Sequence, residues 1–296
     1  MEKIEKYRKL AKIIQFIGMG IIIIVGLFLL FIFRNTGSGI GGNTVYIIAL
    51  TLLAVFMFLT LVGAPMQAKL LKLIILESLN GLVSDVKFSR KKGYSRESFD
   101  KLNLVTESFA SYGCTDYFSF VYKDLLIEST TVRAFDEVKV SRPKGKKGKK
   151  KVVKEIVNHF FGRVYIIPFT SEVKYNIYGK RSADITRKKE MADKDYNNEL
   201  PIKIKKYSEN FEVYYKDEKP TANVQALLEK LYYLRLQAKG PVSLFVRKHS
   251  LVLCIDNSHY YKEVELKNKV DENLIRDYRK DVSMVLSFVN SLNKLD

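Results

Sequence analysis

A cluster of basic side chains near the middle of the chain is the feature best suited to bind a charged partner. The stretch 142–154, RPKGKKGKKKVVK, contains eight Lys or Arg residues and no Asp or Glu. These residues are Arg142, Lys144, Lys146, Lys147, Lys149, Lys150, Lys151 and Lys154. Because Pro143, Gly145 and Gly148 oppose a stable helix, the sequence predicts a mobile loop that joins two strands. Each basic residue that reaches an anionic membrane surface gains about 1 kcal/mol, so the cluster is a candidate site for anionic headgroups.

Two other interpretations of this cluster stay open. The loop could hold phosphates of RNA or DNA through counterion release. Nucleic-acid sites commonly add aromatic side chains on which bases stack, and the stretch 142–154 contains none, which favours lipid. A nucleic-acid role would require a continuous basic face that also includes Arg90, Lys91 and Lys92. The cluster could also be a solvated hairpin loop with no specific partner.

The sequence contains none of the local motifs of common catalytic sites. GxxxxGK[ST], HExxH, GxSxG and CxxC are absent, and GSGIGG at 37–42 lacks the lysine of a phosphate-binding loop. Cys114 is interpreted as a small residue in a turn, and Asp256 with Asn257 as an ordinary turn after a strand. We therefore expect no catalytic residue.

The few cysteines and histidines argue against a metal or cofactor site. Two cysteines, Cys114 and Cys254, cannot form a disulfide framework or a Cys-rich metal site, which fits a reducing compartment. The three histidines, His159, His249 and His259, are scattered and are interpreted as surface or turn residues. We expect no metal and no cofactor.

Two long apolar runs near the N-terminus are each long enough to cross a membrane. Ile13–Phe33 contains 21 residues without a charge, and as a helix it would span about 31 Å, the thickness of a bilayer core. Val45–Ala64 is a second uncharged run of 20 residues, and the glycine-rich connector Arg34–Thr44 separates the two. A cleaved signal peptide usually has a shorter apolar core, of about 7 to 15 residues. Residues 1–65 are therefore predicted to form a two-helix transmembrane hairpin.

Basic residues beside these runs indicate how the hairpin is oriented. Five precede the first run and two follow the second: Lys3, Lys6, Arg8, Lys9, Lys12, Lys69 and Lys72. The connector contributes only Arg34. Because Lys and Arg favour the cytoplasmic side, we predict a two-span plasma-membrane protein with both termini and the large C-terminal part in the cytoplasm.

The rest of the chain predicts a short stalk and one mixed domain. Residues 66–81 have the apolar spacing of a helix that ends at Gly81. Strands rich in aromatic and β-branched residues are then predicted at Tyr117–Tyr122, Leu125–Thr131, Val132–Val140, Val152–Val157, Phe160–Phe169, Glu172–Ile177, Phe211–Tyr215, Val242–Val246 and Leu251–Ile255. Helices are predicted to begin at Pro220 and Asp271. Because strands and helices do not alternate regularly, residues 82–296 are assigned to the α+β class, as a mixed sheet-and-helix domain.

Three segments of this domain resemble a bacterial protein family. They are HFFGRVYIIPF at His159–Phe169, FEVYYKDEKPTANVQALLEKLYYLR at Phe211–Arg235, and the terminal DYRKDVSMVLSFVNSLN. These segments are similar to the family catalogued as domain of unknown function 3137, whose members pair an N-terminal hydrophobic hairpin with a mixed cytoplasmic domain. The resemblance covers the chain from about Met66 to the C-terminus and implies the anchored architecture. No catalytic or ligand-binding residue is assigned in that family, so none is carried over.

Taken together, these features predict a protein that works by binding at a membrane. The net charge of +18 attracts it to the anionic inner leaflet. The favoured function is a membrane-anchored cytoplasmic binding or scaffold module, with a protein partner at the membrane and with the basic loop on anionic lipid. The alternatives are a nucleic-acid-binding membrane protein and a membrane-tethered enzyme with dispersed catalytic residues.

Overall fold

The computed structural model divides the chain into two compact units. Its described residues are 2–35, 51, 65–66, 68–89, 92–105, 107–144, 149–169, 175–181, 198–216, 224–247, 249–257, 270 and 272–292. The first unit comprises Met1–Ser78 and Glu263–Tyr278, and the second comprises Leu79–Lys262 and Arg279–Asp296. The first contains the N-terminal helix, and the second contains the sheet.

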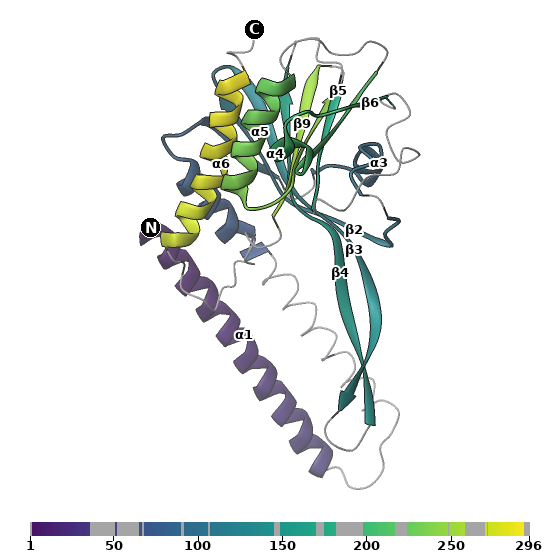
Figure 1. Cartoon of the computed structure of the whole chain (residues 1–296). Coiled ribbons are helices and arrows are strands. Elements are labelled where there is room, and N and C mark those ends of the chain that lie inside the picture. The colour runs from purple at the N-terminus through teal and green to yellow at the C-terminus, as the bar shows by residue number, and fades with distance from the viewer. Residues whose placement is uncertain are drawn as a thin grey trace. The chain divides into compact units, whose positions relative to one another are not determined.

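Helix α1, Glu2–Asn35, is the longest described helix of the first unit (Figure 1). Within its segment Glu2–Leu27, an 18-residue stretch has a mean hydropathy of 2.3 and is 11% buried, and Phe16 and Ile24 are exposed. By length and composition, α1 is long and apolar enough to span a membrane. The core helix of a soluble protein would instead bury most of its apolar side chains. The second predicted span, Val45–Ala64, lies outside the described residues apart from Thr51, so the hairpin stays a prediction.

The predicted stalk helix is present at residues 68–79. Its buried side chains Leu70 and Ile74 have helical spacing. Gly81 follows with a φ of +73°, the left-handed conformation in which glycine often ends a helix. The described helix thus ends two residues before Gly81, and its role as a stalk stays a prediction.

The second unit is built on one nine-stranded sheet in which every described strand pair is antiparallel. Its elements are β1 Ser84–Ser89, α3 Arg96–Asp100, β2 Ser111–Tyr122, β3 Leu125–Lys144, β4 Lys149–Pro168, β5 Tyr175–Gly179, β6 Asn198–Leu200, α4 Lys205–Ser208, β7 Phe211–Tyr215, α5 Val224–Ala238, β8 Val242–Arg247, β9 Ser250–Asp256 and α6 Glu272–Leu292, which contributes residues to both units. The strand order is β1-β2-β3-β4-β9-β8-β5-β7-β6. This confirms the α+β class, with a large antiparallel sheet.

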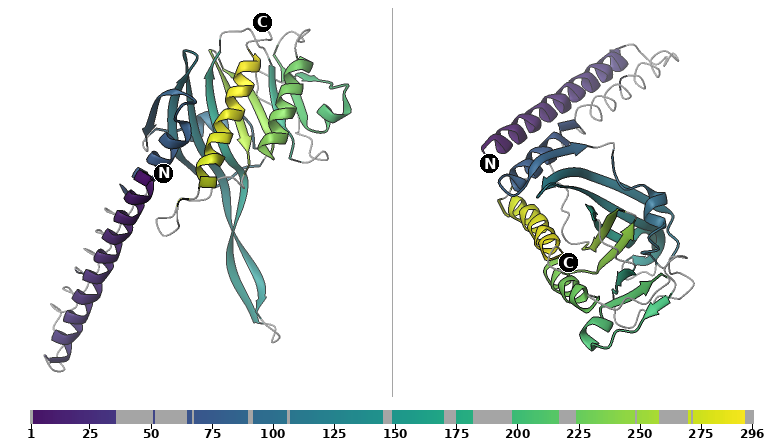
Figure 2. Two further views of the ribbon diagram at one scale, coloured as in Figure 1. Left: turned by 90° about the vertical axis from the view of Figure 1, so that its left-hand side faces the viewer. Right: turned by 90° about the horizontal axis from the view of Figure 1, so that it is seen from above.

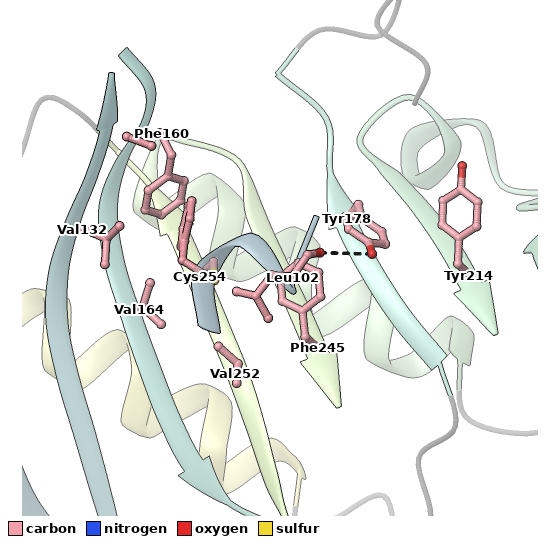
Figure 3. Close-up of a cluster of buried hydrophobic side chains, with 11 residues drawn as sticks. Leu102, Val132, Phe160, Val164, Tyr178, Tyr214, Phe245, Val252 and Cys254 are labelled. Atoms are coloured by element: carbon pink, nitrogen blue, oxygen red, sulfur yellow. Dashed lines mark hydrogen bonds between the residues drawn. The ribbon is translucent and has the colours of Figure 1, made fainter. Parts of the chain in front are cut away.

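Helices cover both faces of this sheet. Helix α5 and the part of α6 after residue 278 lie side by side on one face (Figure 2). On the other face, α3 and the residues after it cover an apolar cluster that includes Phe160 and Val164 of β4 (Figure 3). There the Tyr178 hydroxyl donates a hydrogen bond of 3.3 Å to the carbonyl oxygen of Leu102. Since neighbouring residues of a strand point to opposite faces, β4 supplies core side chains to both layers.

Candidate functional site

The hairpin β3–β4 continues beyond the rest of the sheet as a two-stranded ribbon, drawn in teal in Figure 1. Pairing with β2 ends at Phe135 on β3, and pairing with β9 ends at Gly162 on β4. The two strands stay paired with each other from Phe135 opposite Asn158 to Lys144 opposite Lys149. At about 3.4 Å per residue this part is about 30 Å long. Residues 135–144 and 149–158 are called the basic ribbon below.

Most of the predicted basic site residues lie on the strands of this ribbon. Arg142 and Lys144 end β3, whereas Lys149, Lys150, Lys151 and Lys154 belong to β4. The remaining two, Lys146 and Lys147, lie outside the described residues. The prediction of a loop over the whole stretch 142–154 is therefore wrong. Pro143 is tolerated because each strand of a two-stranded ribbon is an edge, where a missing N–H can face away from the partner.

The register concentrates positive charge at the far end of the ribbon. Arg142 lies opposite Lys151, and Lys144 lies opposite Lys149. Like charges at opposite positions destabilise a strand pair, so folding alone does not favour this arrangement.

The part of the ribbon nearer the sheet, residues 135–141 and 152–158, is called the shaft below. It is less charged than the far end and partly apolar. The Nζ of Lys154 lies 3.0 Å from Oε2 of Glu137, so this lysine is partly neutralised. Four aliphatic side chains of the shaft are exposed: Val138, Val152, Ile156 and Val157. The ribbon thus combines a basic end with an exposed aliphatic shaft.

The root of the ribbon is a β-bulge. Ala134 pairs with Phe160, and the next residue, Phe135, pairs with Asn158, which leaves His159 as an extra residue in β4. A bulge bends its strand and redirects a side chain, and bulges often lie next to functional sites.

The His159 ring lies between two carboxylates. Its Nε2 is 2.8 Å from Oδ2 of Asp136, and its Nδ1 is 3.4 Å from Oε2 of Glu107. The other carboxylate oxygen of Asp136 accepts a hydrogen bond of 2.6 Å from the backbone N–H of Ala110. That backbone donor, followed by the His159 ring, lowers the pKa of Asp136.

Arg181 ties the root of the ribbon to β9. Its Nε and Nη2 donate to Oδ2 of Asp256 at 2.9 and 2.5 Å, and its Nη atoms also donate to the carbonyl oxygens of Asn158 and His159. Oδ1 of Asp256 accepts the backbone N–H of Phe161 at 3.2 Å. Burial raises the pKa of Asp256, and Arg181 opposes that shift. Arg181 is thus a clamp whose donors are used within the protein.

A cavity of about 190 Å³ opens beside this clamp, on the sheet face that α3 covers. Its charged lining consists of Glu107, His159, Lys180, Arg181, Glu212 and Asp256. Its apolar lining includes Leu104, Val105, Phe160, Tyr178 and Pro241. Lys180 pairs with Glu212 at 3.6 Å between Nζ and Oε1. In the described part of the chain, no group of three or more His, Cys, Asp or Glu could hold a metal ion.

The sequence did not predict this cavity. His159 is a nearly buried bulge residue, and Asp256 ends a strand in an ion pair, so their interpretations as a surface or turn residue and as part of a turn are wrong. The cavity residues come from strands and loops far apart in the chain, and no local motif joins them. Cys114 also lies in strand β2, not in a turn, with its Sγ 3.0 Å from Oγ1 of Thr130.

Comparison with known families agrees with the sequence resemblance. Residues 151–294 match a family described as "Protein of unknown function (DUF3137)". Residues 151–294, slightly less than half of the chain, are thus similar to this family. The matched part includes β4–β9 and helices α4–α6, so it is shorter than the predicted range, which began at about Met66. No curated protein and no solved structure matches the chain. The matched part contains His159, Arg181 and Asp256, whereas Glu107 and Asp136 precede it.

Proposed function

We propose that the protein is a membrane-tethered binding module whose basic ribbon contacts anionic lipid headgroups. In this proposal, the runs Ile13–Phe33 and Val45–Ala64 cross the plasma membrane, and both termini and the sheet domain are cytoplasmic. The apolar and exposed helix α1 supports the tether. The tether confines the domain to the membrane surface and so raises its effective concentration toward a protein partner there.

The observation that carries the proposal is the position of the basic residues at the end of a ribbon about 30 Å long. Electrostatic screening at physiological ionic strength acts over about 8 Å. Acidic residues on the sheet body are therefore too far away to cancel the positive potential of the ribbon end. A cluster of this kind attracts anionic lipid even though its root, at Asp136, Glu137 and Glu155, is acidic.

The shaft supports lipid over nucleic acid as the partner. Its exposed aliphatic side chains, among them Val152 and Ile156, suit the boundary between headgroups and acyl chains. Between Asp136 and Asn158 the sequence contains no aromatic residue on which a base could stack.

A vesicle assay tests this function. The full-length protein in phosphatidylcholine nanodiscs is mixed with vesicles that contain phosphatidylserine, and co-flotation is measured at low and physiological salt. The test variant replaces the six lysines between positions 144 and 151, Lys144, Lys146, Lys147, Lys149, Lys150 and Lys151, with Gln. We expect the wild type to float with these vesicles, less so in high salt, and the variant to lose most of this binding.

A matched control separates the ribbon from net charge. It replaces six exposed lysines of the sheet domain and α6, Lys87, Lys101, Lys203, Lys205, Lys216 and Lys280, with Gln. This control has the same net charge as the test variant and should retain vesicle binding. Equal binding by both variants would contradict the proposal. Binding of RNA instead of vesicles would favour the nucleic-acid alternative.

A further inference from the structure

We propose that the cavity beside His159 binds a small primary ammonium compound with an apolar body. This site lies at the root of the basic ribbon and not at its end, so the inference does not depend on lipid binding.

The two basic side chains of the cavity, Lys180 and Arg181, are already paired with buried carboxylates. Arg181 donates to Asp256, whose side chain is 13% exposed, and to two backbone carbonyl groups. Lys180 pairs with Glu212, whose side chain is 4% exposed. An anionic ligand would have to draw Lys180 away from Glu212, and a buried carboxylate without its counterion is costly. The lining therefore opposes an anion.

The remaining charge of the site is negative. Glu107 and Asp136 share one histidine, so this group of three carries a net negative charge whether or not the His159 ring is protonated. The Glu107 side chain is 75% exposed and lines the cavity, where a ligand can reach it from solvent. Its carboxylate can accept hydrogen bonds from an ammonium group.

The apolar part of the lining fits the body of such a ligand. Leu104, Val105 and Pro241 contribute aliphatic surface, and Phe160 and Tyr178 contribute aromatic surface. Aromatic rings attract cations as well as covering apolar groups. The volume of about 190 Å³ leaves room for a body of several carbon atoms. The cavity thus offers a carboxylate for the charge and an apolar wall for the body.

Three probes of similar shape and different charge test the site: isoamylamine, isoamyl alcohol and isovalerate. Each is titrated by calorimetry, at about pH 8, into the full-length protein in phosphatidylcholine nanodiscs. We expect isoamylamine to bind at least about fivefold more tightly than the alcohol, as one partly exposed charge contact provides. We expect isovalerate to bind most weakly.

Two variants locate the binding. Glu107→Gln keeps the shape of an exposed side chain, so it should fold, and it should remove the preference for the amine over the alcohol. Glu199→Gln changes an exposed carboxylate on β6, outside the cavity, and should leave the preference unchanged. Equal binding of all three probes, tighter binding of isovalerate, no binding, or an unchanged preference in Glu107→Gln would each overturn the proposal.

Discussion

Nε2 of His159 lies 2.8 Å from Oδ2 of Asp136 where the basic ribbon leaves the sheet. The two residues belong to opposite strands of the β3–β4 hairpin, and the bulge at His159 brings the ring toward the carboxylate. Beyond this point the ribbon has only two strands, and an isolated two-stranded hairpin is only marginally stable in water. The contact therefore fastens the ribbon at its root.

The first prediction concerns this fastening. Asp136→Asn keeps an oxygen that can accept the Ala110 N–H but removes the charge beside His159. We expect backbone amides of residues 136–158 to exchange hydrogen several-fold faster in this variant, measured by mass spectrometry, because the root contact is weaker. Glu137→Gln removes an exposed ion pair on the same strand and should change the exchange little. Identical exchange in both variants would mean that the His159 contact does not hold the ribbon.

The second prediction concerns the clamp between Arg181 and Asp256. Asp256→Ala leaves the guanidinium and the Phe161 N–H without their acceptor. Removal of one partner from a buried ion pair lowers the free energy of unfolding by about 3 to 5 kcal/mol. Because Arg181 is half exposed, we expect Asp256→Ala to lower the free energy of unfolding by about 2 kcal/mol. Chemical denaturation, followed by tyrosine fluorescence, measures the loss. Glu209→Ala removes an exposed pair with Lys205 and should cost less than about 1 kcal/mol.

The third prediction concerns the close approach of β4 to β9. A Cβ on Gly162 would lie 1.8 Å from the carbonyl oxygen of Ile255, so the two strands would have to separate. Gly162→Ala should therefore lower the free energy of unfolding by about 1 to 3 kcal/mol or more. Gly113, on β2, has no atom within 4 Å of the corresponding position, so Gly113→Ala serves as the control and should be tolerated. Equal thermal midpoints for the two variants would contradict this packing.

The fourth prediction concerns alkaline pH. Burial raises the pKa of five tyrosines in the sheet domain: Tyr94, Tyr112, Tyr117, Tyr165 and Tyr175. The pKa values of Tyr117 and Tyr175 rise to about 12. Tyrosine in an unfolded chain ionises near pH 10, whereas the buried tyrosines of the folded chain stay neutral to a higher pH. The stability that the folded state gains from these neutral side chains is fully present below about pH 10 and is lost as the pH rises through about 12. The thermal midpoint should fall steeply over that interval, together with the rise of phenolate absorbance. Complete ionisation of all 18 tyrosines near pH 10 without loss of structure would contradict this.

Local sequence pattern determined much of the architecture. The apolar spacing of residues 66–81 predicted the stalk helix, and the aromatic and β-branched run Phe211–Tyr215 matches the bounds of β7. The predicted strands Val242–Val246 and Leu251–Ile255 lie within β8 and β9. These features depend on which side chains near each other in sequence must be buried, and that information is local.

The sequence by itself thus determined the apolar N-terminal helix, the α+β class and the charge of the stretch 142–154. Only the tertiary structure decided that most of this stretch extends two strands, because tolerance of Pro143 depends on an edge that the pairing creates. It also decided that His159, Arg181 and Asp256 surround one cavity with Glu107. A bulge and the order of strands bring these residues together, and both arise from long-range register that short sequence segments do not encode.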